Sequence, residues 1–231
     1  MLKIRRANER GRTRTDWLES SHSFSFGEYR DPAHDGLSVL RVLNDDRVAP
    51  GAGFPPHDHR DMEIISWILA GSLAHADNMG HSRVLHADEM QIMTAGSGIR
   101  HSETNPSSTD PVHFLQIWLK PQRLGQKPDY RQARVFAAGE TGIRCAAAPE
   151  EQGLLHLAQD AKVWAVRLAP EEEGALALGV GRQGYFHVAV GAGELNGRWL
   201  DTGDGVHIAG IREVTLRGGA EGLAGVFLDL P

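Results

Sequence analysis

Two short strings of residues carry side chains that can bind a metal ion. His57 and His59 are separated by one residue, and His101 and Glu103 have the same spacing. On a β-strand, residues i and i+2 point to the same face, so each pair can converge on one ion. If the two strands lie side by side, the four side chains form a cluster of three imidazoles and one carboxylate.

This donor set suits a first-row divalent ion: Fe, Mn, Co, Ni, Cu or Zn. It contains no thiolate, which argues against a structural zinc site. Affinity alone would favour Cu or Zn, so the donors do not choose the metal. Four protein donors leave one or two positions open on a five- or six-coordinate ion. Substrate, water or O₂ can bind there, and the pattern therefore favours catalysis over scaffolding.

The elements that would position these donors are predicted to be short strands. Apolar runs such as 63–69, 112–119 and 185–190 lie between scattered Gly and Pro, of which there are 27 and 11. The run 112–119 alternates and is rich in aromatic and β-branched residues. This pattern predicts an all-β sandwich or barrel. The stretch 150–159 is expected to form a short helix.

The chain is expected to divide into two domains. Residues 119–128 are polar, contain two prolines and have no periodicity, which is typical of a connector. We place the boundary between about 120 and 135, with domains 1–125 and 126–231. The second half also has a β pattern, but its His156, His187 and His207 stand apart from one another. One metal site, in the first domain, is therefore predicted.

Composition excludes several classes of protein. The 231 residues carry a net charge of −6 with His neutral and contain no basic block, so direct nucleic-acid binding is disfavoured. A single cysteine, Cys145, cannot form an intrachain disulfide. The N-terminus is charged, without an apolar signal segment, and no run approaches the ~18 apolar residues of a membrane span. We expect a soluble cytoplasmic protein, without a membrane partner.

The wider context of the histidines resembles a known superfamily. Gly51, the His-x-His string, Glu63 and Gly71 are followed by a glycine-rich turn, His101 and Asn105. This order resembles the cupin pattern, with one residue too many before Gly71 and with Gly96 where proline is usual.

The departures point to one branch of the cupins. Residues 54–60, 93–103 and 21–29 closely resemble the pirin family, with consecutive matches over about residues 15–125 and looser similarity beyond. The resemblance implies an all-β bicupin, with two jelly-roll-like β-barrel domains in one chain. It also implies that the second domain is a degenerate cupin without a metal.

In the family, the iron ligands are the histidines of His-x-His and the His and Glu of the second string. The resemblance therefore implies Fe(II) held by His57, His59, His101 and Glu103. A generic cupin would instead use Glu63, and strand parity leaves both carboxylates open because Glu63 shares the face of His57 in a regular strand. Four other histidines are candidates for the approach to the site: His75, His81, His86 and His113.

The activity that the resemblance implies is quercetin 2,3-dioxygenation. A flavonol would bind through its deprotonated 3-hydroxyl, with Glu103 as ligand and base, and react with O₂ with loss of carbon monoxide. Candidate walls of an apolar pocket are Phe54, Met62, Ile64 and Met93.

Two alternatives stay open. Eukaryotic pirins are described as redox-sensitive partners of transcription factors, which would make this chain an iron-dependent regulatory protein. The same barrel can also host a metal-dependent isomerase or hydrolase. A monomer is expected, because two barrels in one chain can cover each other's sheets as a cupin dimer would.

Overall fold

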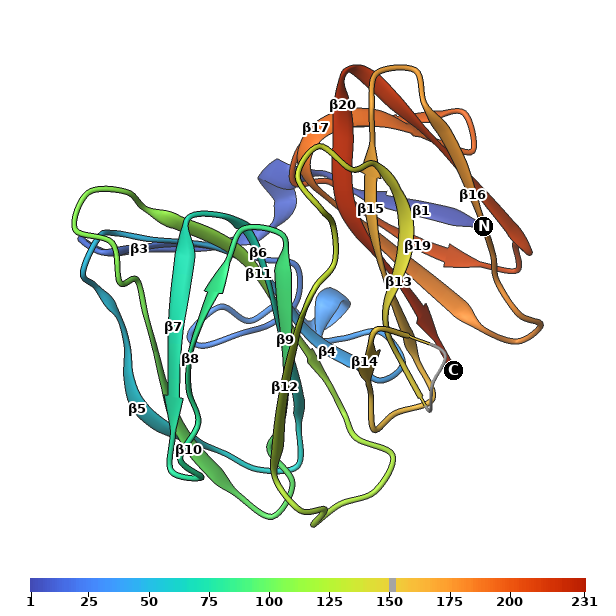
Figure 1. Ribbon diagram of the computed structural model, residues 1–231. Coiled ribbons are helices and arrows are strands. Elements are labelled where there is room, and N and C mark those ends of the chain that lie inside the picture. The colour runs from blue at the N-terminus through green and yellow to red at the C-terminus, as the bar shows by residue number, and fades with distance from the viewer. Residues whose placement is uncertain (150–152) are drawn as a thin grey trace. The chain divides into compact units, whose positions relative to one another are not determined.

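The computed structural model describes residues 1–149 and 153–231 and folds them almost entirely into strands (Figure 1). Within these residues the helical segments are two short 3₁₀ turns, η1 (Ala7–Glu9) and η2 (Pro32–His34). The all-β prediction is confirmed. No helix in the described ranges has the length and hydropathy that a bilayer span requires. The chain forms two compact units, one of residues 11–135 and one of residues 1–10 with 136–231.

The unit of residues 11–135 consists of two antiparallel sheets. A four-stranded sheet has the order β5-β10-β7-β8, and a seven-stranded sheet has the order β12-β9-β6-β11-β4-β3-β2. Their bounds are β2 (Gly11–Arg14), β3 (Leu18–His22), β4 (Leu40–Val48), β5 (Gly53–His59), β6 (Glu63–Ala70), β7 (Ser72–Asp77), β8 (Ser82–His86), β9 (Glu89–Thr94), β10 (Ile99–Thr104), β11 (Val112–Leu119) and β12 (Asp129–Arg134).

Alternation along the strands divides the interior of this unit into layers. On β6, Ile64 and Ile68 belong to two different apolar clusters, and Ser66 lies between them on the same face. On β11, Phe114 and Trp118 contact the same two clusters and Gln116 lies between them. The interior therefore has a polar layer with apolar packing on both sides of it, and this layer holds the site described below.

The other unit is built around one nine-stranded sheet. Its path is β1-β19-β17-β20-β15-β13-β14, with β16 paired to β20 and β18 to β17. The bounds are β1 (Leu2–Arg5), β13 (Gly142–Ala148), β14 (Leu155–His156), β15 (Lys162–Leu168), β16 (Glu173–Ala177), β17 (Gln183–Leu195), β18 (Arg198–Leu200), β19 (Gly205–Ala209) and β20 (Glu213–Leu230).

The two units differ from the expected division at residue 125. β12 follows the connector but pairs along its whole length with β9, from Asp129 opposite Thr94 to Arg134 opposite Glu89. The first ten residues lie in the other unit because β1 pairs with β19. Hydrogen bonding between strands, and not local composition, sets both boundaries.

The expected helix at 150–159 falls partly on residues 150–152, which lie outside the described residues. For residues 153–159 the prediction is wrong. Leu155 and Leu157 are buried and His156 between them is exposed, which is the alternation of a strand. Accordingly β14 pairs in parallel with the end of β13.

Candidate metal centre

Two neighbouring strands bring three imidazoles together. β5 and β10 are antiparallel, with His57 directly opposite His101. The ring centroid of His57 lies 4.7 Å from that of His59 and 4.5 Å from that of His101, and the last two are 5.0 Å apart. One nitrogen from each ring lies within 4.8 Å of the others. The strand spacing that suggested convergence thus produces it for the histidines.

Two prolines shape this part of β5. The register of β5 against β10 shifts between the pairs His101–His57 and Glu103–Phe54, where Pro55 and Pro56 lie. Proline has no backbone N–H to give to a ladder, so a bulge is its natural place in a strand. The carbonyl of Pro55 accepts a hydrogen bond from Nδ1 of His57, at 2.8 Å. That bond leaves the Nε2 lone pair of His57 available for an ion.

His101 lies deepest of the three. Its side chain is 1% exposed, and Nε2 has no hydrogen-bond partner among the described residues. Burial, followed by the neighbouring His57 and His59, lowers the pKa of His101 to about 2. Burial and His57 lower the pKa of His59 to about 4. Neutral His59 and His101 rings, with Nε2 of His101 buried and without a partner among the described residues, fit a first-row divalent ion.

Glu103 is fully buried and points toward the opposite sheet. Its Oε1 accepts hydrogen bonds from Nε2 of Gln91 at 2.8 Å and from Oγ of Ser66 at 3.2 Å. Its Oε2 accepts a hydrogen bond from Nε2 of Gln116 at 2.9 Å. Burial raises the pKa of Glu103 to about 7, although these three donors act to lower it. One carboxylate oxygen lies within 4.8 Å of ring nitrogens of His75 and His101.

Glu63 is separated from His57 and His59 by a turn that carries the chain from one sheet to the other. β5 ends at His59 and β6 begins at Glu63 in the other sheet, with Asp61 between them at φ 50°. The regular strand that would put Glu63 on the face of His57 is therefore absent. Among the described residues, Glu63 belongs to neither metal-binding group, and its Oε2 accepts a hydrogen bond from Thr94 at 3.0 Å.

His75, a candidate for the approach to the site, lies beside the cluster. His75 is on β7, which pairs with β10 on the side away from β5. Its Nδ1 lies 3.4 Å from Nδ1 of His101, and its Nε2 lies 3.1 Å from Oδ2 of Asp77. His81 also contacts Asp77 Oδ2, at 2.8 Å. The signal that could have found this group is the spacing His75-x-Asp77, which puts both side chains on one face of a strand.

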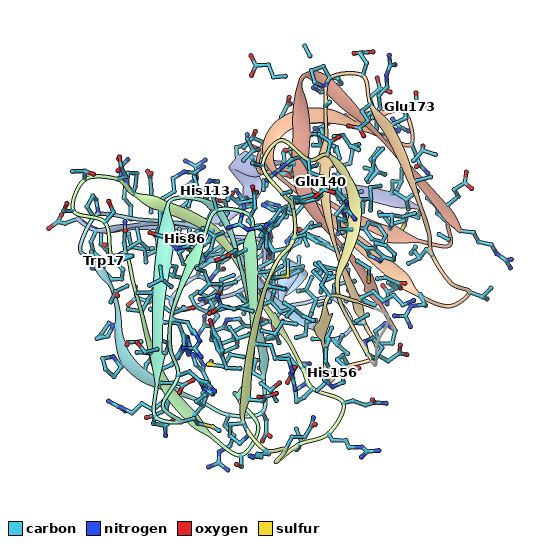
Figure 2. All side chains as sticks on the ribbon, viewed as in Figure 1. Trp17, His86, His113, Glu140, His156 and Glu173 are labelled. Carbon is cyan, nitrogen blue, oxygen red and sulfur yellow. The ribbon has the colours of Figure 1, made fainter. Side chains whose placement is uncertain are left out.

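Two other histidines lie away from the site. His86 pairs with Ser72, and His113 pairs with Ala70, on either side of Gly71. Figure 2 shows both at the same end of this unit. They do not belong to the cluster.

A cavity of about 240 Å³ is lined by Gln116 and Phe54, which contact Glu103 and His57, and by none of the cluster residues themselves. Phe54 and Phe26 contribute rings to its wall, and Gln116, which donates to Glu103, is also part of that wall. The ring of Trp118 contacts His59 on one edge and Phe26 on another, with centroids 4.9 and 5.5 Å apart. Of the four expected pocket residues, Phe54 lines the cavity, whereas Ile64 and Met93 are buried in an apolar cluster against which Met62 packs.

The polar side of the same cavity contains His22. Its ring nitrogens lie 2.8 Å from Oδ1 of Asn44 and 2.8 Å from Oγ1 of Thr13. Ser20 donates a short hydrogen bond to Asp46, and both of these side chains also line the cavity. The cavity therefore combines aromatic rings with buried polar groups, which is typical of a small-molecule site.

Comparison with known proteins decides the family. The family model described as Pirin matches residues 3–119, and the model of the quercetinase C-terminal cupin domain matches residues 145–230. The chain belongs to the pirin family. Its fold is that of a bicupin, as predicted.

This pirin is similar along its whole length to proteins of Escherichia coli. It is 39% identical to a protein of Escherichia coli K12 named quercetin 2,3-dioxygenase, with 100% of this chain and 99% of the relative covered. The crystal structure of YhhW from E. coli superimposes with a TM-score of 0.95 at 38% identity, covering 100% of this chain and 98% of that one. A structure of bacterial pirin YhhW in complex with nickel(II) has a TM-score of 0.93 at 38% identity, covering 100% and 99% of the two chains.

Proposed function

We propose that this pirin is a metal-dependent dioxygenase that cleaves a flavonol such as quercetin with O₂. The observation that carries the proposal is the buried, unpartnered Nε2 of His101 beside two further imidazoles and a buried carboxylate. The name of the E. coli relative supports the same reaction class. We propose that the protein acts as a monomer and needs no protein or nucleic-acid partner for this reaction.

The residues that would hold the metal are His57, His59, His101 and Glu103. Three imidazoles suit Fe(II), which we propose as the native ion, and they also suit Ni(II), the ion bound in a YhhW structure. When bound, the ion supplies Lewis acidity toward the 3-hydroxyl of the flavonol and redox chemistry toward O₂.

Glu103 is proposed to accept the proton of the 3-hydroxyl. A buried carboxylate with a pKa near the working pH is suited to a general base. Gln91, Gln116 and Ser66 each donate to this carboxylate, so it is held toward the interior by three strands of the opposite sheet. General base catalysis by a positioned side chain contributes about 10²–10⁴-fold in rate.

The cavity lined by Phe54 and Gln116 is proposed to bind the flat aromatic substrate. Phe54 and Phe26 can pack against its rings. Asn44, Asp46 and His22 are placed to hydrogen-bond to phenolic hydroxyls at the other side of the cavity. Dry aromatic walls orient the substrate and keep bulk water from the reacting carbon.

The test is anaerobic loading with Fe(II), followed by quercetin and O₂. Loss of the flavonol absorbance and release of carbon monoxide report turnover. His101→Ala and Glu103→Ala should each lower turnover by at least about 100-fold. His86→Ala, a histidine at the far end of the same unit, is the matched control and should keep wild-type turnover. Metal content is measured for every sample.

Absence of turnover in wild-type protein that holds its metal would reject the dioxygenase. The redox-sensing alternative would then be tested by comparing partner binding by the Fe(II) and Fe(III) forms. Turnover without O₂ would instead favour the isomerase or hydrolase.

A further inference from the structure

Three buried side chains, those of His101, His75 and Asp77, form a chain of contacts. The chain begins at Nδ1 of His101, the ring nitrogen on the other side of the imidazole from Nε2. Nδ1 of His101 lies 3.4 Å from Nδ1 of His75, and Nε2 of His75 lies 3.1 Å from Oδ2 of Asp77. The His75 and Asp77 side chains are both 0% exposed. The ring of Tyr130 stacks on His75 with centroids 4.5 Å apart and planes at 28°. This stacking restricts rotation of the imidazole.

Hydrogen-bonding capacity fixes the position of each hydrogen in this chain. The Asp77 carboxylate accepts hydrogen bonds from the backbone N–H groups of Met79 and His81 at Oδ1 and from a His81 ring nitrogen at Oδ2. An ionised carboxylate can only accept, so Nε2 of His75 must be the donor toward it. A neutral imidazole carries one N–H, and Nδ1 of His75 is then an acceptor.

The same rule determines the tautomer of His101. Because Nδ1 of His75 accepts, Nδ1 of His101 must carry the hydrogen and donate it. Nε2 of His101 is then a bare lone pair, and this atom is the buried nitrogen without a partner among the described residues. In the opposite arrangement Nε2 would carry an N–H that no metal could use as a ligand.

We infer that Asp77, acting through His75, holds His101 in the tautomer whose Nε2 lone pair faces the metal. Asp77 and His75 are thus positioning residues. His75 contacts the ligand His101 directly, and Asp77 acts on His101 through His75. The inference rests on His101 being a metal ligand, as in the proposed function. Second-layer groups of this kind typically change metal affinity by about 10–100-fold.

His75 is also near enough to His101 and Glu103 to be considered a direct ligand. If His75 were a direct ligand, its Nδ1 lone pair would bind the metal and would not accept a hydrogen bond from His101. The two roles therefore give different results when His75 is replaced by glutamine or methionine, which have similar size. The amide oxygen of glutamine can accept from Nδ1 of His101, and its NH₂ can donate to Asp77, whereas methionine offers neither.

The first measurement is made on metal-free protein labelled with ¹⁵N in its histidines. Long-range ¹H–¹⁵N NMR reports which ring nitrogen of His101 carries the hydrogen. Wild-type protein should show Nδ1–H. Asp77→Asn can donate to Nε2 of His75 and should reverse the chain, giving Nε2–H at His101. His75→Gln should keep Nδ1–H, and His75→Met should give a mixture of both forms.

The second measurement is the Kd for Ni(II), from competition with a chelator of known affinity. Asp77→Asn and His75→Met should weaken binding by about 10–100-fold, and His75→Gln by less than about 3-fold. Asp31→Asn removes the carboxylate of another imidazole–carboxylate pair in the same unit and should leave Kd unchanged.

Several outcomes would overturn the inference. These are an Nε2–H tautomer in the wild type, wild-type Ni(II) affinity in Asp77→Asn, or equal affinity losses in His75→Gln and His75→Met. If Asp77→Asn does not fold, the Gln–Met pair decides alone. Neither measurement involves turnover. A protein with the expected tautomers and Ni(II) affinities but no quercetin cleavage would keep the inference and reject the dioxygenase.

Discussion

Burial acts in opposite directions on the two kinds of donor at the metal centre. It lowers the pKa of His101 to about 2 and of His59 to about 4, because a charged imidazole loses solvation. It raises the pKa of Glu103 to about 7, because a carboxylate ion also loses solvation. In the metal-free protein, His59 and His101 are neutral near neutral pH and Glu103 is close to half protonated.

These shifts predict how the stability of the metal-free unit depends on pH. Since the histidine pKa values are lower when folded, their contribution to stability increases as the pH rises to about 6.5. Since the Glu103 pKa is higher when folded, its contribution decreases from about pH 4.5 to 7. Two histidines oppose one glutamate, so the net contribution of these groups increases between about pH 4.5 and 6.5.

Glu103→Gln removes the contribution to stability that decreases as the pH rises, because glutamine does not titrate. The free energy of unfolding of the variant should therefore rise more steeply than that of the wild type, by up to about 1.4 kcal/mol per pH unit. Urea denaturation of metal-free protein between pH 5 and 6.5 measures this slope. Glu19→Gln, at an exposed pair with Arg14, is the control and should match the wild type. Equal slopes for Glu103→Gln and the wild type would contradict the prediction.

At the scale of residues, spacing identified the histidines but not their surroundings. His57 and His59 could be predicted because a period of two places them on one face of a strand, and the same spacing pairs His101 with Glu103 on another. Local spacing leaves Glu63 as an alternative ligand, because no local pattern marks the change of sheet at Asp61. Spacing offers His75 only as a candidate for the approach to the site, because its partner, His101, is 26 residues away and approaches it only across a sheet. Contacts between strands are not encoded in local spacing.

At the scale of elements, the close approach of β5 to β10 is what gathers the ligands. Gly53 lies opposite Thr104, and a Cβ atom at Gly53 would be 2.2 Å from the carbonyl oxygen of Glu103 and 2.5 Å from Cα of Thr104. Both contacts involve backbone, which cannot move aside as a flexible side chain can. Glycine at this position allows the two strands to pair in the register that places His57 opposite His101.

Gly53→Ala should therefore separate the two strands and weaken metal binding. We expect the Kd for Ni(II) to increase on the order of 10-fold or more and the unit to lose about 1–3 kcal/mol of stability. Gly51→Ala is the matched control. Gly51 has φ 69° but open space around its Cβ position, so alanine there costs about 1 kcal/mol of backbone strain without displacing β10. Equal metal affinities for the two variants would show that the strand contact does not set the site.

The elements themselves were predictable where alternation is strong. β11 could be recognised because polar His113 and Gln116 interrupt an apolar run that is rich in aromatic and β-branched residues. The bulge at Pro55–Pro56 could not, because proline in a short string is equally compatible with a turn. Residues 153–159 were assigned to a helix although Leu155 and Leu157 alternate with an exposed His156, since so short a run fits both periods.

At the scale of the whole molecule, the first ten residues belong to the same unit as residues 136–231. β1 pairs with β19, about 200 residues later in the chain. Local composition contains no information about such a partner, and the expected division into 1–125 and 126–231 therefore assigned this segment to the first domain. The family resemblance predicts two barrels, but it does not predict that the first strand pairs with β19 in the unit of residues 136–231.

Asp204 attaches this N-terminal segment to its unit. The carboxylate is nearly buried, with 3% of its side chain exposed, and accepts from Nη1 of Arg6 at 2.6 Å and from the backbone N–H of Ala7 at 2.8 Å. Asp204→Ala leaves these donors without their acceptor and should lower the stability of this unit by about 2–4 kcal/mol. Glu171→Ala breaks an exposed pair with Arg217 and should cost less than about 1 kcal/mol.

Neither substitution should change metal binding, because all residues of the candidate metal centre lie in the unit of residues 11–135. Differential scanning calorimetry of full-length protein with and without Ni(II) separates the two effects. The metal should raise the unfolding temperature of the metal-binding unit by the same amount in the wild type and both variants, since stabilisation by a ligand depends on its concentration and Kd alone. A smaller shift in Asp204→Ala would mean that the N-terminal strand supports the metal centre as well as its own sheet.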